Sequence, residues 1–220
     1  MRRLLLIAAS SLVIVAGCGG SKAAEPAPPP PPPPAPKPTP PPPVHVVVKP
    51  SRTYTKAQLP RLALQQRNAP PDMRQIRDET GFRTLEQIGL ILPRQIKEAR
   101  SYGFRAVYDS VFASTSKLSD RRIAERVWLF KNAKGASGWL AKTKADAAAF
   151  QFDEVTARRL GEESWAAHGL PQVAGGEVIT HAFRLGNAVF VVTTYGEATP
   201  VTPEAALAAA EAALARARRV

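Results

Sequence analysis

Apolar residues recur at helical spacing in two stretches of the first half of the chain. In Thr55–Gln66 the apolar positions have the spacing of one helix face. Pro60 fits such a helix only in its first turn, because proline lacks the backbone N–H that later turns need. A second apolar stripe begins after Thr84 and continues to Ala99. Pro93 lies inside this stripe, and we expect it to kink or split the helix.

The middle of the chain is rich in aromatic and β-branched residues, which favour strands. These residues predict three strands, at Gly103–Ala113, Arg122–Lys131 and Val155–Leu160. Between the second and the third strand, apolar residues up to Phe150 repeat at helical spacing. We expect Ser137 to cap the start of that helix, because serine is a favoured N-cap residue.

Two further strands are predicted near the C-terminus, at Glu177–Leu185 and Ala188–Tyr195. They flank Gly186 and Asn187, and two turn-forming residues between apolar runs are typical of a β-hairpin. A last helix should follow Thr202, where a capping side chain, a proline and an acidic residue occur in succession.

The predicted order of elements is helix, two strands, helix, three strands and helix. Hairpin connections make neighbouring strands antiparallel, and helices then cover the sheet. The sequence therefore predicts an α+β fold, with a mainly antiparallel sheet of about five strands flanked by helices.

The start of the chain has a different pattern. Arg2 and Arg3 precede an apolar run, Leu4–Val15, which leads through small residues to Cys18, the only cysteine of the 220 residues. This combination is typical of a secretory signal peptide, and the run is shorter than the roughly 20 residues that a membrane-spanning helix needs. Val15–Cys18 resembles the lipobox of bacterial lipoproteins. The resemblance implies a diacylglycerol on the Cys18 thiol, cleavage just before Cys18 and, usually, acylation of the new amino terminus.

A proline-rich tract follows the cysteine. In Pro26–Pro43, fourteen of eighteen residues are proline, and such a run adopts polyproline II, a semi-rigid spacer of about 55 Å at roughly 3.1 Å per residue. The alternative is a docking peptide for a proline-binding module, but those modules are mostly intracellular. The chain should thus consist of a signal peptide at 1–17, a lipidated, proline-rich stalk at 18–50 and one α+β domain at 51–220.

Positive charge is concentrated in the first part of this domain. The whole chain has a formal charge of +12, and Ser51–Val107 contains eleven Lys or Arg against five Asp or Glu. An excess of positive charge gives information about binding partners and not about the fold. A place outside the cytoplasm argues against nucleic acid, so we expect an anionic cell-wall polymer, a lipid or an envelope protein. Abundant arginine without a specific partner is the alternative.

The sequence contains no recognised catalytic or nucleotide-binding motif. With three histidines and one lipidated cysteine, we expect no metal and no cofactor. His181 lies in phase with Ile179 and Phe183, so we expect a histidine packed on the apolar side of the sheet, with a role as base or ligand as the alternative. Trp128 and Trp165 are the other candidate binding residues.

For three further polar residues we expect no functional role. His168 is expected in a loop, beside a glycine. Glu162 and Glu163 are expected to be solvated on a turn, and general acid–base catalysis by this pair is the alternative.

A recurring pattern of structural motifs occupies Arg126–Ala136, Leu160–Ser164, Arg184–Val192 and the alanine-rich terminal helix. It is similar to uncharacterised actinobacterial-type lipoproteins and, more distantly, to PsbP-like domains and extracellular sensor domains of kinases. The resemblance covers about Leu59–Arg219. It implies an antiparallel sheet flanked by helices and a binding or accessory role without established catalysis, and it identifies no functional residue.

The sequence therefore predicts a lipoprotein on the extracytoplasmic face of a bacterial membrane. Its domain would bind a ligand or a partner without catalysing a reaction. One alternative is an envelope hydrolase or transferase that uses His181 with a nearby carboxylate. Another is a structural tether, in which Ser51–Val107 contacts an anionic wall polymer.

Overall fold

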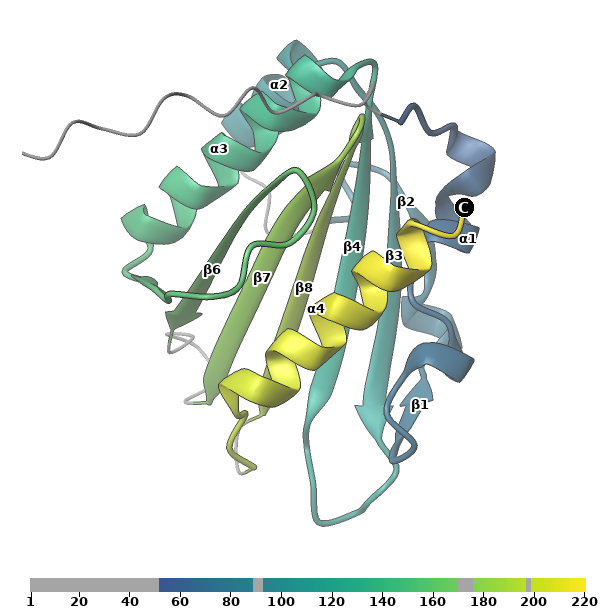
Figure 1. The fold of residues 1–220 in the computed structure, drawn as a ribbon, viewed down its shortest axis with the longest axis vertical. Coiled ribbons are helices and arrows are strands. Elements are labelled where there is room, and N and C mark those ends of the chain that lie inside the picture. Colours follow the sequence, from purple (N-terminus) through teal and green to yellow (C-terminus); the bar gives the residue numbers. More distant parts are fainter. Residues whose placement is uncertain (1–51, 89–92, 170–175, 197–198) are drawn as a thin grey trace, which may run out of the picture. The chain divides into compact units, whose positions relative to one another are not determined.

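The computed structural model describes residues 52–88, 93–169, 176–196 and 199–220. In this part of the chain, eight strands form one antiparallel sheet in the spatial order β1-β3-β4-β8-β7-β6-β5, and β2 also pairs with β3 (Figure 1). The strands are β1 (Met73–Gln75), β2 (Gly81–Arg83), β3 (Phe104–Ser114), β4 (Arg122–Phe130), β5 (Asp153–Glu154), β6 (Glu163–Gly169), β7 (Glu177–Leu185) and β8 (Ala188–Gly196).

The helices of this part are placed before, between and after the strands. The α-helices are α1 (Leu59–Leu62), α2 (Pro93–Ser101), α3 (Ala133–Ala149) and α4 (Pro203–Ala217), and the 3-10 helices are η1 (Lys56–Gln58), η2 (Gln66–Asn68) and η3 (Arg77–Glu79). None of these helices has both the length and the apolar character that a membrane crossing requires. The predicted signal peptide, Cys18 and the proline-rich tract lie outside the described residues.

The α+β class and the antiparallel sheet are confirmed, but the expected number of strands was too low. Five long strands, β3, β4, β8, β7 and β6, form the centre of the sheet. The additional strands β1, β2 and β5 are only two or three residues long. A strand of that length is too short to show an alternation of apolar and polar residues, so it cannot be recognised from the residue pattern.

The predicted strand at Val155–Leu160 was wrong. These residues form an irregular connection, and the strand follows it as β6. Both faces of β6 are at least partly covered, so its sequence lacks the clear alternation of a half-buried strand. His168 therefore lies in a strand, opposite Ile179 of β7, and not in a loop.

Two helix starts also differ from expectation. The second helix begins at Pro93, a position that suits proline, whereas Thr84 opens a turn. Helix α3 begins after Asn132, whose side chain accepts a hydrogen bond from the backbone N–H of Gly135. Ser137, the expected cap, lies within the helix.

The last helix begins as predicted. Thr202 Oγ1 accepts a hydrogen bond from the Ala205 N–H, and Pro203 is the first helical residue. The first predicted helix is shorter than expected, because only Leu59–Leu62 of Thr55–Gln66 is α-helical.

Different helices cover the two faces of the sheet (Figure 1). Helix α4 packs on β7 and β8 on one face, which we call the α4 face, and α1 contacts α4 there. Helix α3 packs on β4, β6, β7 and β8 on the other face, the α3 face. Successive side chains of β4 point to opposite faces of the sheet. Val127 therefore belongs to the apolar cluster on the α4 face, and Trp128 to the cluster on the α3 face.

The core of the α4 face is closely packed. The rings of Phe183 and Phe190 are fully buried and stacked with centroids 4.8 Å apart. Alanines on the inner side of α4 let the helix approach them. Burial of each phenylalanine contributes about 1.5–3 kcal/mol, so this stack is a main source of stability.

The predicted hairpin turn joins β7 to β8 and also fixes the start of the domain. Gly186 has φ +56°, and a Cβ there would lie 1.6 Å from the Arg52 carbonyl oxygen, so only glycine fits. The Asn187 side chain donates to the carbonyls of Tyr54 and Phe130 and accepts from the Tyr54 N–H.

Among the residues that the structure describes, the buried members of the core clusters lie between Tyr54 and Ala217. The chain divides into two compact units, and the second comprises residues Val46–Val220. A unit of this size that contains its own core can fold alone.

Candidate functional site

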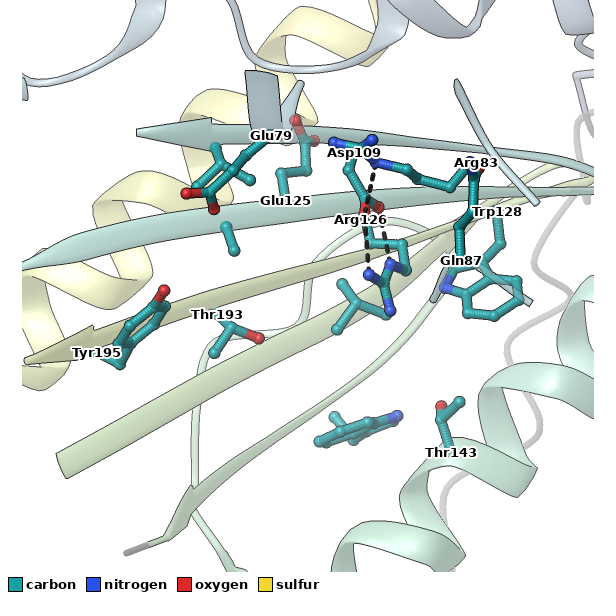
Figure 2. A pocket seen from close by; sticks show the side chains of 14 residues that line it. Glu79, Arg83, Gln87, Asp109, Glu125, Arg126, Trp128, Thr143, Thr193 and Tyr195 are labelled. Atoms are coloured by element: carbon teal, nitrogen blue, oxygen red, sulfur yellow. Dashed lines mark hydrogen bonds and ion pairs between the residues drawn. The ribbon is translucent and has the colours of Figure 1, made fainter. Parts of the chain in front are cut away.

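A hollow of about 560 Å³ opens on the part of the α3 face that α3 leaves uncovered (Figure 2). Strands β3, β4 and β8 form its floor. Thr143 of α3 and Trp165 of β6 line one side, and Glu79, Arg83 and Gln87 line another. The hollow therefore draws on segments that are far apart in the sequence.

An ion pair lies at the centre of this floor. Asp109 of β3 is directly opposite Arg126 of β4, and the guanidinium donates from Nε and Nη2 to the two carboxylate oxygens at 2.7 and 2.8 Å. Arg83 Nε is 4.0 Å from the same carboxylate, so Asp109 lies between two guanidinium groups (Figure 2). A bidentate pair of this kind fixes the plane of the arginine.

Arg126 retains capacity for a further partner. Its Nη1 has no hydrogen bond within the described residues, and its side chain is 35% exposed. Its guanidinium also lies 6.0 Å from the centre of the Trp128 ring, at the limit of a cation–π contact. A fixed guanidinium with an unused nitrogen is a prepared donor for a polar ligand.

A second polar group includes three residues that line the hollow, Glu79, Thr193 and Tyr195. Arg122 Nη2 donates to Glu79 Oε1 at 2.5 Å, and its guanidinium is 5.8 Å from the Tyr195 ring centre. Burial raises the pKa of the Tyr195 phenol, although the positive charge of Arg122 acts in the opposite direction. The Thr193 hydroxyl is 3.2 Å from that of Thr180.

Two of the three candidate binding residues from the sequence meet in this hollow. Trp128 is nearly buried at 4% exposure, and half-buried Trp165 donates from its indole N–H to the Leu140 carbonyl at 3.3 Å. His181 lies instead on the α4 face, with 4% exposure. Burial lowers the pKa of its imidazole, and the described residues provide no carboxylate that is paired with it.

The sequence reasoning missed Asp109 and Arg126 as site residues. Each lies in a predicted strand, at a position whose neighbours two residues away are mostly apolar or small. A charged residue at such a position indicates either that the strand lies at the edge of the sheet or that a residue of opposite charge pairs with it. The pairing could be recognised only once the β3–β4 register placed the two residues opposite each other.

The expectation that Glu162 and Glu163 are merely solvated was wrong. Arg184, whose side chain is 11% exposed, pairs with both carboxylates at 2.5 and 2.8 Å. Ser137 of α3 also donates to Glu163 Oε2 at 2.8 Å. Burial raises the pKa of Glu163, but the bonds from Ser137 and Arg184 outweigh it, so the pKa is lowered. This network attaches α3 to β6 and β7 and keeps Glu163 ionised.

Within the four described ranges, no three His, Cys, Asp or Glu side chains lie close enough together to hold an ion.

Comparison with known proteins gives one informative likeness. No family model matches the sequence, and no curated protein matches it either. The structure is similar to that of the extracellular domain of PknH from Mycobacterium tuberculosis, with a TM-score of 0.54 and 15% sequence identity. The match covers 77% of this chain and 100% of that chain. At this identity, the likeness shows a shared fold.

Proposed function

We propose that residues 52–220 form a non-catalytic binding domain that acts outside the cytoplasm, anchored through lipid on Cys18. The fold supports this proposal because it is shared with an extracellular domain. The signal-peptide pattern and the lipobox resemblance at Cys18 give the same location independently.

The ligand in this proposal is a small molecule rich in hydroxyl groups, such as a saccharide unit of the cell envelope. The observation that supports it best is the Arg126–Asp109 pair, which presents an unused N–H in the hollow that the half-buried indole of Trp165 also lines. Aromatic faces pack against the apolar face of a sugar ring, while charged and hydroxyl side chains pair with its hydroxyls. The volume of about 560 Å³ is within the range of small-molecule sites.

Binding is preferred to catalysis because Asp109 and Glu163, two acids near the hollow, are engaged in ion pairs. Glu125 also lines the hollow, but its side chain is fully buried on the α4 face, where no ligand in the hollow can reach its carboxyl. Asp109 is held by Arg126 and Arg83, and Glu163 is held by Arg184 and Ser137. A general acid needs a pKa close to neutrality, and the pKa of Glu163 is lowered instead. The alternative hydrolase lacks a carboxylate paired with His181 within the described residues.

Calorimetric titration of residues 46–220 with saccharides tests the proposal. The probes are N-acetylglucosamine, its β-1,4-linked disaccharide, mannose, galactose and glucuronic acid. We expect heat of binding for at least one of them, and a loss of about tenfold or more in affinity for Arg126→Met, since about 1.4 kcal/mol corresponds to tenfold.

The matched control is Arg158→Met, which removes a guanidinium that is 77% exposed outside the hollow. It should leave the affinity unchanged. Absence of binding by every probe, or equal binding by both variants, would contradict the proposal.

Lipid anchoring has its own test. In cells that export the full chain, Cys18→Ser should remove the protein from the membrane fraction that the unmodified chain enters. An unchanged membrane fraction would contradict anchoring at Cys18.

A further inference from the structure

Four arginines gather on the α4 side of the molecule, away from the hollow. Arg61 belongs to α1, Arg67 to η2, Arg216 to the last turn of α4, and Arg219 follows that helix. Both α1 and η2 contact α4, and Figure 1 shows α1 beside the C-terminal end of α4. We call these four residues the arginine surface.

The four positive charges are close to one another. Burial lowers the pKa of Arg216, and the charges of Arg67, Arg219 and Arg61 lower it further. Within the described residues, no side-chain carboxylate forms an ion pair with any of the four. Seven other arginines each have an acidic partner, namely Arg83, Arg100, Arg121, Arg122, Arg126, Arg158 and Arg184. Arg74 and Arg105 also form no ion pair with a carboxylate of the described residues, but they do not belong to α1, η2 or α4. The arginine surface is thus an uncompensated positive patch.

Glu125 is the acid whose charge acts on Arg216, but it does not neutralise the arginine surface. Glu125 is fully buried on the α4 face, where Oε2 accepts a hydrogen bond from the Leu64 N–H. Burial raises the pKa of its carboxyl to about 8, so Glu125 is mostly neutral at pH 7. Glu125 Oε1 and Arg216 Nε are both buried without a hydrogen-bond partner in the described structure.

We propose that the arginine surface binds the phosphate groups of a soluble polyanion, such as a phosphate-bearing polymer of the cell envelope. The planar guanidinium fits two phosphate oxygens at once, and several arginines together suit repeated phosphates. This interaction is separate from the binding of a ligand in the hollow and does not depend on it.

A polymer is preferred to a membrane surface because the patch lacks an apolar component. The exposed large hydrophobic residues of the described chain are Phe82, Leu118 and Phe150. None of them belongs to α1, η2 or α4. A protein surface that inserts into a bilayer combines basic residues with apolar side chains, whereas guanidinium groups alone suffice to bind the phosphates of a soluble polymer.

The test uses residues 46–220 and a fluorescein-labelled chain of inorganic polyphosphate, with binding followed by fluorescence anisotropy. We expect binding that weakens as salt rises from about 0.1 to 1 M, because exposed charge contacts are screened. Arg61→Gln/Arg219→Gln changes two exposed residues of the surface. It should reduce the affinity about tenfold or more, since charge-assisted bonds to phosphate are lost.

The matched control is Arg74→Gln/Arg105→Gln, which removes the same charge from two exposed strand residues outside the surface. This control should lose much less affinity. Equal loss in both double variants would show that only net charge matters and would overturn the proposal. Circular dichroism of each variant confirms that its fold is intact.

A second probe separates polymer from membrane. Vesicles of phosphatidylglycerol and phosphatidylcholine, mixed one to three, should bind much more weakly than polyphosphate. Tight vesicle binding that Arg61→Gln/Arg219→Gln abolishes, without polyphosphate binding, would replace the polymer by a membrane. Arg126→Met should leave polyphosphate binding unchanged, so failure here is distinct from failure at the hollow.

Discussion

The two faces of the sheet are covered to different extents. On the α4 face, α1 and α4 close over a continuous apolar cluster that contains Phe183 and Phe190. On the α3 face, α2 and α3 cover only a part, around Trp128 and Trp139, and the rest forms the hollow. The strands β4 and β8 contribute alternate side chains to both faces. The position of the helices therefore decides where a site can open.

Two acids on neighbouring strands show what this difference does to side chains. Asp109 faces the hollow and has the guanidinium of Arg126 as its partner. Glu125 faces α1 and α4, accepts a hydrogen bond from the Leu64 N–H, and has its pKa raised by burial to about 8. The acid at the open face thus forms an ion pair with an arginine, whereas burial at the closed face favours the protonated form of the acid.

The largest expected effect is at the closed face. Phe190→Ala should lower the free energy of unfolding by about 3–5 kcal/mol, because it leaves a cavity beneath α4. Val191→Ala, one residue further and only half-buried on the other face, should cost less than about 1.5 kcal/mol. Urea unfolding of residues 46–220 measures both, and equal losses would contradict the difference between the faces.

The pH dependence of stability should depend on Glu125. Between the ordinary pKa of 4.5 and the raised value of about 8, the folded protein holds a proton that the unfolded chain has released. The free energy of unfolding therefore falls as pH rises through this window, by up to a few kcal/mol. Glu125→Gln removes the titrating group and should flatten the fall.

The range from pH 6.5 to 8 tests Glu125 most cleanly. The pKa of His181 is lowered by burial, so its effect has the opposite sign, a loss of stability as pH falls below about 6.5. The matched control is Glu211→Gln, an exposed acid that should leave the slope unchanged. An unaltered slope in Glu125→Gln would contradict the buried, protonated state.

A smaller effect is expected from the ion pair in the hollow. Asp109→Asn and Arg126→Met should each cost about 1–2 kcal/mol, less than a fully buried pair, because Arg126 is 35% exposed. In a double-mutant cycle the two losses should not add, since both remove the same interaction. Strict additivity would show that the two side chains act independently.

The smallest effect belongs to the exposed pair Arg158–Glu211, whose side chains are 77% and 42% exposed. Glu211→Gln should change the free energy of unfolding by less than about 0.5 kcal/mol, because solvent and salt screen such pairs. A thermal unfolding measurement at low and high salt checks it, and a loss above 1 kcal/mol would contradict this ranking.

The long strands and the last helix could be predicted from the sequence because their signals are local. The hairpin at Gly186 depends on a turn residue that the backbone requires, and Thr202 caps α4 with its own side chain. The start of α3 was misplaced, because Asn132 and Ser137 are both good caps and only the hydrogen bond to Gly135 distinguishes them.

The candidate site could be predicted only in part because its contacts are not local. Aromatic content drew attention to Trp128 and Trp165, but nothing in the sequence indicated that they share one hollow. Asp109 and Arg126 are seventeen residues apart and meet through strand register. Glu163 and Arg184 likewise pair across β6 and β7. Such partners become visible only when the order and register of the strands are known.

The central claim, that a ligand binds in the hollow of the α3 face, is tested most directly by nuclear magnetic resonance. Residues 46–220, labelled with nitrogen-15, would be titrated with the N-acetylglucosamine disaccharide and the other saccharide probes. We predict amide and indole shifts around Arg126, Trp165 and Thr193, with none around His181. Shifts confined to the α4 face, or no shift with any probe, would contradict the claim.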